Sequence, residues 1–246
     1  MKTFSAFNND KSMKATLVSL AVKHEAADQY IAGTYDTWGG ALFRGCSVGC
    51  TINDFNDMHN LSIYHGDHNA LAENLGVPPF ITRLQDTLFE GLPTPQRYSF
   101  TPKLLTAINV GSDLTEVLPK FLKFVLEDLI DNLDEVESIG VREAVQGSLD
   151  VVANWVVTGV VDSDAASDAS RAAIYTASYA DRAARAASDA AIYADRAAIY
   201  AASGAASCAA RAASYAAIYA PSDTAYTRYA DHLIHLIEEC YTEDNI

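Results

Sequence analysis

Basic residues are scarce in this sequence. Its 246 residues include 17 lysines and arginines against 32 aspartates and glutamates, which gives a formal net charge of −15 at pH 7. No lysine occurs after Lys123. A surface this acidic repels nucleic-acid phosphates, so we expect no direct binding to DNA or RNA. The same charge favours solubility and suits a partner protein with a basic face.

Cysteines and long apolar runs are also few. The four cysteines, Cys46, Cys50, Cys208 and Cys240, do not form the dense pattern of a disulfide-stabilised secreted domain. The apolar run from Leu17 to Val22 is short for a signal peptide and lacks a cleavage site. No stretch reaches the ~18 apolar residues of a membrane-spanning helix. We therefore expect a cytoplasmic protein that does not associate with membranes.

Alanine, by contrast, dominates one part of the chain. Of the 56 residues from 165 to 220, 27 are alanine, and the tripeptide Ala-Ile-Tyr occurs four times, which indicates an internal repeat. Alanine is the best helix former because it loses no side-chain entropy in a helix. We expect several helices, interrupted near Tyr179 and Gly204. Their alanine faces let neighbouring helices pack closely or drive self-association into a homo-oligomer.

Helix signals precede the alanine-rich part as well. Asp10 can cap a helix that runs to about Tyr30. Asp67 can cap a short helix that ends at Gly76. Pro79 suits the first turn of the next helix, because its missing N–H has no intrahelical partner there. Further helices are expected over residues 79–91, 101–108, 113–136 and 141–157 and from 222 onward.

The segment from 31 to 52 has a different composition. It is rich in glycine and aromatic residues, and Gly39-Gly40 lies between two short runs. These runs form either a small hairpin turned at the two glycines or an irregular loop over the helices. The predicted fold is mainly α, a multi-helix bundle with this one small element. We divide it into an N-terminal domain, residues 1–161, and an alanine-rich helical domain, residues 162–246.

One cluster holds residue types that carry nucleophilic or metal chemistry. Cys46 and Cys50 are followed by His65 and His68. Catalysis requires a thiolate within reach of an imidazole, with either cysteine as nucleophile and either histidine as base. The spacing matches no standard zinc arrangement, and the simpler interpretation is two buried cysteines and surface histidines. We therefore favour a protein that is not an enzyme, without cofactor or metal, and keep a Cys/His-dependent hydrolase or transferase as an alternative.

The helix expected after Asp113 carries a run of acids with no basic neighbour in the sequence pattern. They are Glu127, Asp128, Asp131, Asp134, Glu135 and Glu137. Such a run is typical of a solvated outer face. The alternative is a docking surface for a basic partner, and these six residues are the candidates for that contact.

Several segments together resemble a protein family. They are Gly33-Thr-Tyr35, Arg44-Gly-Cys-Ser-Val-Gly-Cys-Thr51, Leu75-Gly-Val-Pro78, residues 83–93 and Ala230-Asp-His-Leu-Ile-His-Leu-Ile237. The family is uncharacterised and is carried by bacteriophages and mobile elements. Its members join a GCxVGC N-terminal part to alanine-rich helices resembling those of predicted bacterial immunity proteins. The resemblance covers most of residues 30–240 and transfers no catalytic residue.

The resemblance implies a genomic setting rather than an activity. Small acidic phage proteins without catalytic motifs are often inhibitors of host defence that act by binding. The inference therefore follows from the genomic setting and not from a motif in this chain. It implies a phage-encoded anti-defence protein in the host cell cytoplasm, whose partner is a bacterial defence protein, CRISPR-like or other, with a basic surface. An oligomeric structural adaptor built on the alanine faces is a further alternative.

Overall fold

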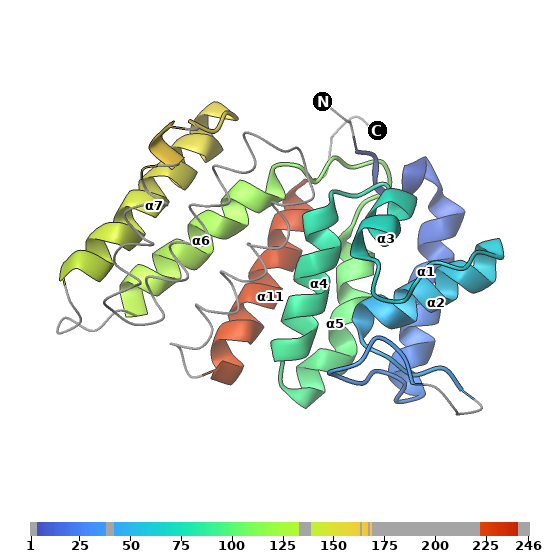
Figure 1. The fold of residues 1–246 in the computed structure, drawn as a ribbon. Helices are drawn as coiled ribbons and strands as arrows, with labels where there is room; N and C mark the ends of the chain where they lie inside the picture. Colours follow the sequence, from blue (N-terminus) through green and yellow to red (C-terminus); the bar gives the residue numbers. More distant parts are fainter. Residues whose placement is uncertain are drawn as a thin grey trace. The chain divides into compact units, whose positions relative to one another are not determined.

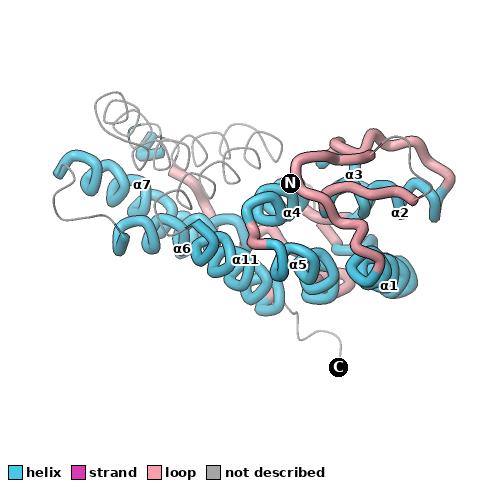
Figure 2. The backbone as a smooth tube through the Cα atoms, turned by 90° about the horizontal axis from the view of Figure 1, so that it is seen from below, coloured by secondary structure: helices cyan, strands magenta, loops and turns pink. Residues whose placement is uncertain are grey.

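The computed structural model describes residues 4–37, 42–132, 139–162, 164–166, 168 and 222–240. These residues form helices and connecting loops, without a sheet, so the mainly α prediction is confirmed (Figures 1 and 2). The chain divides into two compact units. The N-terminal unit comprises residues 2–115 and 230–246, and the central unit comprises residues 116–229.

The N-terminal unit contains most of the described helices. They are the short 3₁₀ helix η1 (Ala6–Asn9), α1 (Lys11–Ala26), α2 (Ser47–His59), α3 (His68–Leu75), α4 (Pro79–Gly91) and α5 (Thr94–Ala107). Helix α1 packs on α5 and α2, while α4 packs on α2, α3 and α5. Large side chains fill the space between them, and Phe7, Leu17, Tyr30, Leu84 and Phe89 are almost completely buried.

Two of the expected helix caps are present in this unit. The Asp10 carboxylate accepts hydrogen bonds from the backbone N–H groups of Ser12 and Met13 at the start of α1. The Asp67 carboxylate accepts one from Ala70 at the start of α3. Helix α3 ends at a left-handed Gly76, as the sequence predicts. These local signals therefore predicted where the helices start, although α1 ends at Ala26, before Tyr30.

Helix α2 occupies residues that the sequence analysis assigned to a hairpin or loop. It begins at Ser47, with Cys46 as its N-cap, and runs to His59. Gly49 and the β-branched residues nearby lower the helix propensity, so the pattern gave no helix signal there. The described residues of 31–37 and 42–46 form an irregular loop with one isolated bridge, between Tyr30 and Gly45. The two glycines of the expected hairpin turn lie outside the described residues.

Helix α5 begins at Thr94, seven positions before the expected start at Thr101. Pro95 lies in its first turn, where proline is tolerated. Pro102, which suggested a helix start, lies inside α5, where its missing N–H removes one intrahelical hydrogen bond. Thr101, Leu104 and Leu105 beside Pro102 are buried, so packing of α5 offsets the lost hydrogen bond.

The central unit contains α6 (Val117–Asn132), α7 (Ile139–Thr158) and the first turns of α11 (Ser222–Glu239), whose later residues belong to the N-terminal unit. Helices α6 and α7 pack against each other. The buried face of α6 is an apolar stripe at helical spacing: Leu118, Phe121, Leu122, Val125, Leu126 and Leu129. The helix starts at Val117, after the expected start at Asp113, whose carboxylate accepts a hydrogen bond from the backbone N–H of Thr115.

The alanine-rich stretch is described only at its beginning. Asp162 accepts hydrogen bonds from the backbone N–H groups of Asp164 and Ala165, as expected of a helix cap, and Ala166 packs on Val151 of α7. The repeat, its close packing and its interruptions near residues 179 and 204 lie outside the described residues. The domain boundary at residues 161–162 adjoins that stretch and stays a prediction.

Candidate functional site

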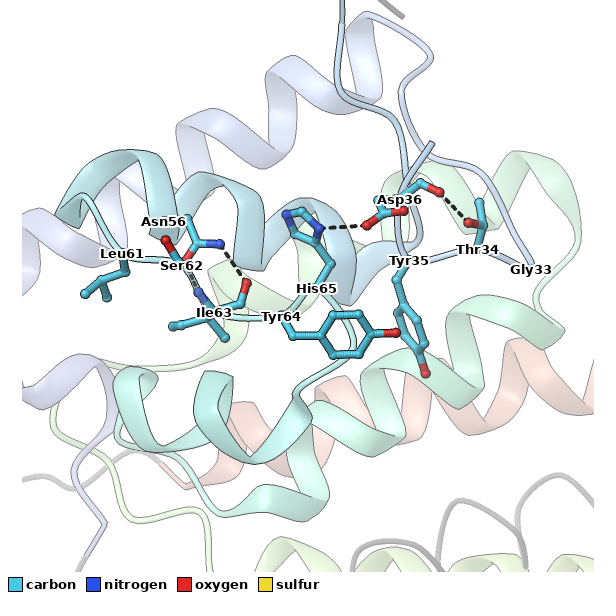
Figure 3. A pocket seen from close by; sticks show the side chains of 10 residues that line it. All are labelled: Gly33, Thr34, Tyr35, Asp36, Asn56, Leu61, Ser62, Ile63, Tyr64 and His65. Atoms are coloured by element: carbon cyan, nitrogen blue, oxygen red, sulfur yellow. Dashed lines mark hydrogen bonds and ion pairs between the residues drawn. The ribbon is translucent and has the colours of Figure 1, made fainter. Parts of the chain in front are cut away.

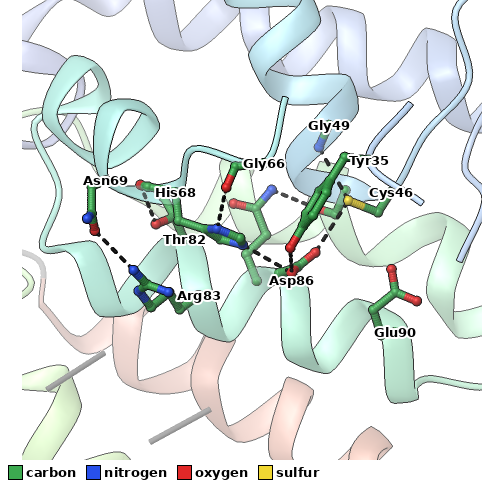
Figure 4. Close-up of polar contacts among 12 residues, drawn as sticks. Tyr35, Cys46, Gly49, Gly66, His68, Asn69, Thr82, Arg83, Asp86 and Glu90 are labelled. Carbon is green, nitrogen blue, oxygen red and sulfur yellow. Dashed lines mark hydrogen bonds and ion pairs between the residues drawn. The ribbon is translucent and has the colours of Figure 1, made fainter. Parts of the chain in front are cut away.

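The Asp86 carboxylate on α4 is the centre of a polar cluster drawn from four parts of the N-terminal unit (Figure 4). Cys46, the N-cap of α2, donates its thiol hydrogen to Oδ1 of Asp86 over 3.3 Å. The Tyr35 hydroxyl donates to Oδ2 over 3.1 Å, and Nε2 of His68, the first residue of α3, lies 3.0 Å from the same oxygen. The carboxylate thereby joins a loop and three helices.

Backbone contacts set the orientation of His68. Its Nδ1 lies 2.9 Å from the carbonyl oxygen of Gly66, so this ring nitrogen faces the backbone and Nε2 faces Asp86. The edge of the Tyr35 ring packs on the imidazole, with centroids 5.6 Å apart. The side chains of His68 and Asp86 are only 10% and 17% exposed. The imidazole therefore has one defined position in a nearly dry environment.

The two glycines of the Gly-Cys-Ser-Val-Gly-Cys block allow the Tyr35 loop to lie directly on the start of α2. A Cβ atom at Gly49 would lie 1.8 Å from the Tyr35 carbonyl oxygen, and one at Gly45 would lie 2.2 Å from it. Neither distance is physically possible for a carbon atom, so both positions need glycine as the backbones are placed. The block thus positions Tyr35 and Cys46 on the same carboxylate.

Buried hydrogen bonds between neighbouring residues hold the helices that carry the cluster. The Gln85 amide donates to the Ser47 hydroxyl over 2.7 Å, and the Thr101 hydroxyl donates to the same oxygen over 2.6 Å. The Thr82 hydroxyl donates to the His68 carbonyl oxygen over 2.9 Å. These bonds connect α2, α4 and α5 and hold the start of α3, so the helices carrying the cluster are fixed relative to one another.

The four predicted catalytic candidates have separate hydrogen-bond partners in the structure and do not form a Cys–His pair. It brings Cys46 and His68 to opposite oxygens of Asp86, so the carboxylate lies where an imidazole would be needed to activate the thiol. The Cys50 thiol donates to the Gly45 carbonyl oxygen, and His65 pairs with Asp36 over 2.9 Å. Among the described residues, no hydrogen bond joins these cysteines to either histidine.

The electrostatics around both thiols oppose thiolate formation. Burial and then the negative charge of Asp86 raise the pKa of Cys46 far above its ordinary value. Burial and Asp54 raise the pKa of Cys50 to about 12. A cysteine nucleophile needs a pKa near or below neutrality, which nearby positive charge normally supplies. The cluster as described therefore holds a protonated thiol.

Glu90 lies one helical turn beyond Asp86 on α4, on the Cys46 side of the cluster (Figure 4). One of its carboxylate oxygens accepts the backbone N–H of Gly33 over 2.6 Å. Burial, followed by the charge of Asp86, raises the pKa of Glu90. One ligand atom each from Cys46, Asp86 and Glu90 lie within 4.8 Å of one another. Sequence reasoning missed both acids, although an acidic pair spaced i,i+4 on a predicted buried helix was a detectable signal.

A pocket of ≈ 620 Å³ opens beside this cluster, between residues 33–36 and 61–65 (Figure 3). Asp36 and His65, which pair with each other, both line it, and Tyr64, a largely exposed residue, lies next to Tyr35. Asn56 fixes the far wall, because its side-chain amide exchanges two hydrogen bonds with the backbone of Ile63. Tyr35 belongs both to the pocket lining and to the Asp86 cluster.

The acidic residues of α6 form a second candidate site, in the central unit. The expectation that they lack basic neighbours is wrong for two of them, because Glu127 pairs with Lys123 and Asp128 pairs with Arg228. Asp131 is exposed. The other three predicted contact residues, Asp134, Glu135 and Glu137, lie outside the described residues.

Asp128 is bound within the protein. It accepts two hydrogen bonds of 2.7 Å from the Arg228 guanidinium and one of 2.8 Å from the Tyr229 hydroxyl. The Tyr229 ring packs edge-on against Phe121 and Phe124 of α6. Asp128 therefore holds the first turns of α11 on α6, which makes it a structural residue.

A groove of ≈ 450 Å³ runs between α6 and α7 beside these acids. Apolar side chains and Gln146 line part of it, and acids line the rest. The lining residues are Phe124, Ile130, Leu149, Gln146, Glu127, Asp128 and Asp131. The groove thus combines an apolar surface with negative charge.

Comparison with known proteins identifies no relative. No family model matches the chain, and no curated protein and no solved structure matches it. Among the described helices, none is long and apolar enough to cross a membrane.

Proposed function

We propose that this chain is a binding protein that engages a basic protein surface through the groove between α6 and α7. The observation that carries the proposal is the placement of Glu127 and Asp131 beside apolar Phe124, Ile130 and Leu149 in one groove. Protein interfaces typically combine an apolar centre with a polar rim, and this groove offers both. Lysine or arginine side chains of the partner would complement the carboxylates.

The charge of the whole chain supports the same conclusion. A net charge of −15 attracts a basic partner over long distances and raises the association rate at low salt. It also repels nucleic acid, so the acidic surface competes with nucleic acid for the same basic proteins. A protein of this kind blocks a nucleic-acid-binding surface by occupying it.

The family resemblance extends the proposal to a biological role. In that role the chain is encoded by a bacteriophage and inhibits a bacterial defence protein, CRISPR-like or other, whose basic surface normally binds nucleic acid. The Cys/His enzyme is not advanced as a second function, because Asp86 separates Cys46 from His68. The adaptor alternative depends on alanine faces outside the described residues.

The binding test uses the full-length chain and charge variants with a matched control. The chain captures proteins from a bacterial lysate, and each captured protein is then purified and titrated by calorimetry at increasing NaCl. We expect the affinity to fall about tenfold or more as salt rises beyond the range where exposed charges interact. The double variant Glu127→Gln/Asp131→Asn should weaken binding by about tenfold.

The control is Glu143→Gln, which makes one substitution of the same kind at an exposed position of α7 that does not line the groove. Its affinity should equal that of the wild type. An affinity that is independent of salt, or that responds equally to Glu143→Gln and to the double variant, contradicts binding through the groove.

The anti-defence role has its own readout. The chain is expressed in bacteria that carry one defined defence system, and the plating efficiency of a sensitive phage is measured. We expect restored plating with the wild type and with Glu143→Gln but not with the double variant. Unchanged plating across the known classes of defence system would contradict the role and leave the binding result standing.

A further inference from the structure

We propose that Cys46 Sγ, one carboxylate oxygen of Asp86 and one of Glu90 bind a divalent transition-metal ion, Zn²⁺ being the ion this donor set suits best. The three ligand atoms lie within 4.8 Å of one another and come from the N-cap of α2 and from one face of α4. This site lies in the N-terminal unit and does not depend on the proposed partner groove in the central unit.

The two oxygens of Asp86 have separate roles in this arrangement. Oδ2 is occupied by hydrogen bonds to Tyr35 and His68, whereas Oδ1 faces the Cys46 thiol (Figure 4). Metal-binding carboxylates are commonly held by such outer hydrogen bonds, which orient the remaining oxygen toward the ion. Tyr35 and His68 are therefore positioning residues for the ligand oxygen of Asp86.

The other two ligands are also oriented by neighbouring groups. The backbone N–H of Gly49 lies 3.4 Å from Cys46 Sγ, and that of Gly33 lies 2.6 Å from a carboxylate oxygen of Glu90. Backbone donors of this kind stabilise negative charge on sulfur and oxygen. His68 is itself held by its contact with the Gly66 carbonyl oxygen. All three ligands thus have defined positions before an ion arrives.

The local charge balance is consistent with a cation. The thiol of Cys46 and the carboxylates of Asp86 and Glu90 bring their ligand atoms within 4.8 Å of one another. A divalent ion between them would offset the negative charge of the two carboxylates and of the Cys46 thiolate. On binding, the Cys46 S–H bond breaks, the metal–sulfur bond forms and the proton passes to the buffer.

The donor set favours Zn²⁺ over the hard alkaline-earth ions. Mg²⁺ and Ca²⁺ prefer oxygen ligands alone, whereas Zn²⁺ accepts thiolate together with carboxylate. Three protein ligands leave one position of a tetrahedral ion for water or another small ligand. The prediction that the chain binds no metal was based on the spacing of cysteines and histidines. It did not consider Asp86 and Glu90 as ligands.

The test uses the full-length chain, first stripped of metal with a chelator. Titration with Zn²⁺ should give saturable binding of one ion per chain. Titration with Co²⁺ should produce a sulfur-to-metal charge-transfer band, which reports a thiolate ligand. The variant Cys46→Ser should lose this band, whereas the matched control Cys50→Ala, a buried cysteine four residues away on the same helix, should keep it.

One charge variant and one positioning variant test the carboxylate ligands without removing a buried side chain. Glu90→Gln should weaken Zn²⁺ affinity more than about tenfold, and the positioning variant Tyr35→Phe by about tenfold, while Glu143→Gln should have no effect. Circular dichroism and thermal unfolding confirm that each variant is folded. If Cys46→Ser does not fold, the Zn²⁺ affinity of Glu90→Gln decides whether the site binds metal. Absence of saturable Zn²⁺ binding, a band that survives Cys46→Ser, or an affinity insensitive to Glu90→Gln overturns the proposal.

Discussion

At the scale of single residues, the N-terminal unit depends on pairing histidines with aspartates. His24 lies 2.9 Å from Asp54, His65 lies 2.9 Å from Asp36 and His68 lies 3.0 Å from Asp86. The His24–Asp54 pair is the most buried of the three and joins α1 to α2. A buried charge is tolerated only with such a partner, so each pair constrains how its two segments pack.

His24 should make folding stability depend on pH. Burial lowers its pKa, but the hydrogen bond and charge of Asp54, with the hydrogen bond to Gln29, outweigh burial, so the net pKa is raised from 6.5. The pair's contribution is therefore complete below pH ~6.5 and is lost as pH rises through the raised pKa of the folded state. We expect Asp54→Asn to cost about 3 kcal/mol at pH ~6 and less at pH ~8.5.

Urea unfolding of both proteins across this pH range measures the difference. Asp57→Asn, at an exposed position of the same helix, is the control and should change stability by less than about 0.5 kcal/mol at every pH. A cost of Asp54→Asn that is constant with pH would show that His24 does not titrate with the pair.

At the scale of elements, helix α2 exists because the Tyr35 loop packs against its first turn. Its sequence has poor helix propensity, yet most of its first nine residues are buried, so tertiary contacts stabilise it. Burial of this kind outweighs the few tenths of a kcal/mol per residue that separate good from poor helix formers.

Two glycine substitutions should therefore have opposite effects. Gly49→Ala places a Cβ 1.8 Å from the Tyr35 carbonyl oxygen and should lower the free energy of unfolding by about 3 kcal/mol or more. Gly147→Ala, within α7, meets no atom within 4 Å and should raise it by about 0.5–1 kcal/mol. Chemical denaturation measures both, and wild-type stability for Gly49→Ala would contradict the close packing of the loop on α2.

The contact between α6 and the start of α11 predicts different effects for two acids of α6, because Asp128 takes part in it and Asp131 is exposed. Asp128→Asn removes a charged acceptor from Arg228 and Tyr229 and should cost about 2 kcal/mol. Asp131→Asn, one turn away and exposed, should change stability by less than about 0.5 kcal/mol. Thermal and urea unfolding measure both. Equal effects would show that the Asp128 contacts contribute no net stability.

At the scale of the whole molecule, excess negative charge determines the response to salt. The net charge of −15 makes the folded chain repel itself, and added salt screens this repulsion. The same screening weakens attraction to a basic partner. Salt should therefore stabilise the chain while it weakens the complex.

We expect the melting temperature of the free chain to rise with NaCl. The rise should be about 2–4 °C for each kcal/mol of repulsion relieved, because a chain of this size has a correspondingly large unfolding entropy. Differential scanning calorimetry at low and physiological ionic strength measures it. A melting temperature that falls with NaCl would mean that attractive ion pairs, such as Arg228–Asp128, outweigh the net repulsion.

The sequence alone determined the mainly α fold and many helix starts. Asp10 and Asp67 cap helices through hydrogen bonds to residues two or three positions away, and the buried side chains of α6 follow the helical period. Such contacts join residues within about one helical turn, so the local sequence contains all the residues needed to predict them. Where burial decided the outcome, as in α2 and the first turns of α5, local patterns were insufficient.

Only the tertiary structure decided which groups surround the side chains of the candidate site. His68 is 18 positions from Asp86, and Cys46 is 40 positions from it, so no spacing in the sequence joins them. The candidate cysteines and histidines were recognised by residue type, but Asp86, which contacts Cys46 and His68, and Asp36, which pairs with His65, lie on other elements. A residue's type is fixed by the sequence, whereas its electrostatic environment arises from packing, which brings Cys46 to 3.3 Å and His68 to 3.0 Å from the distant Asp86.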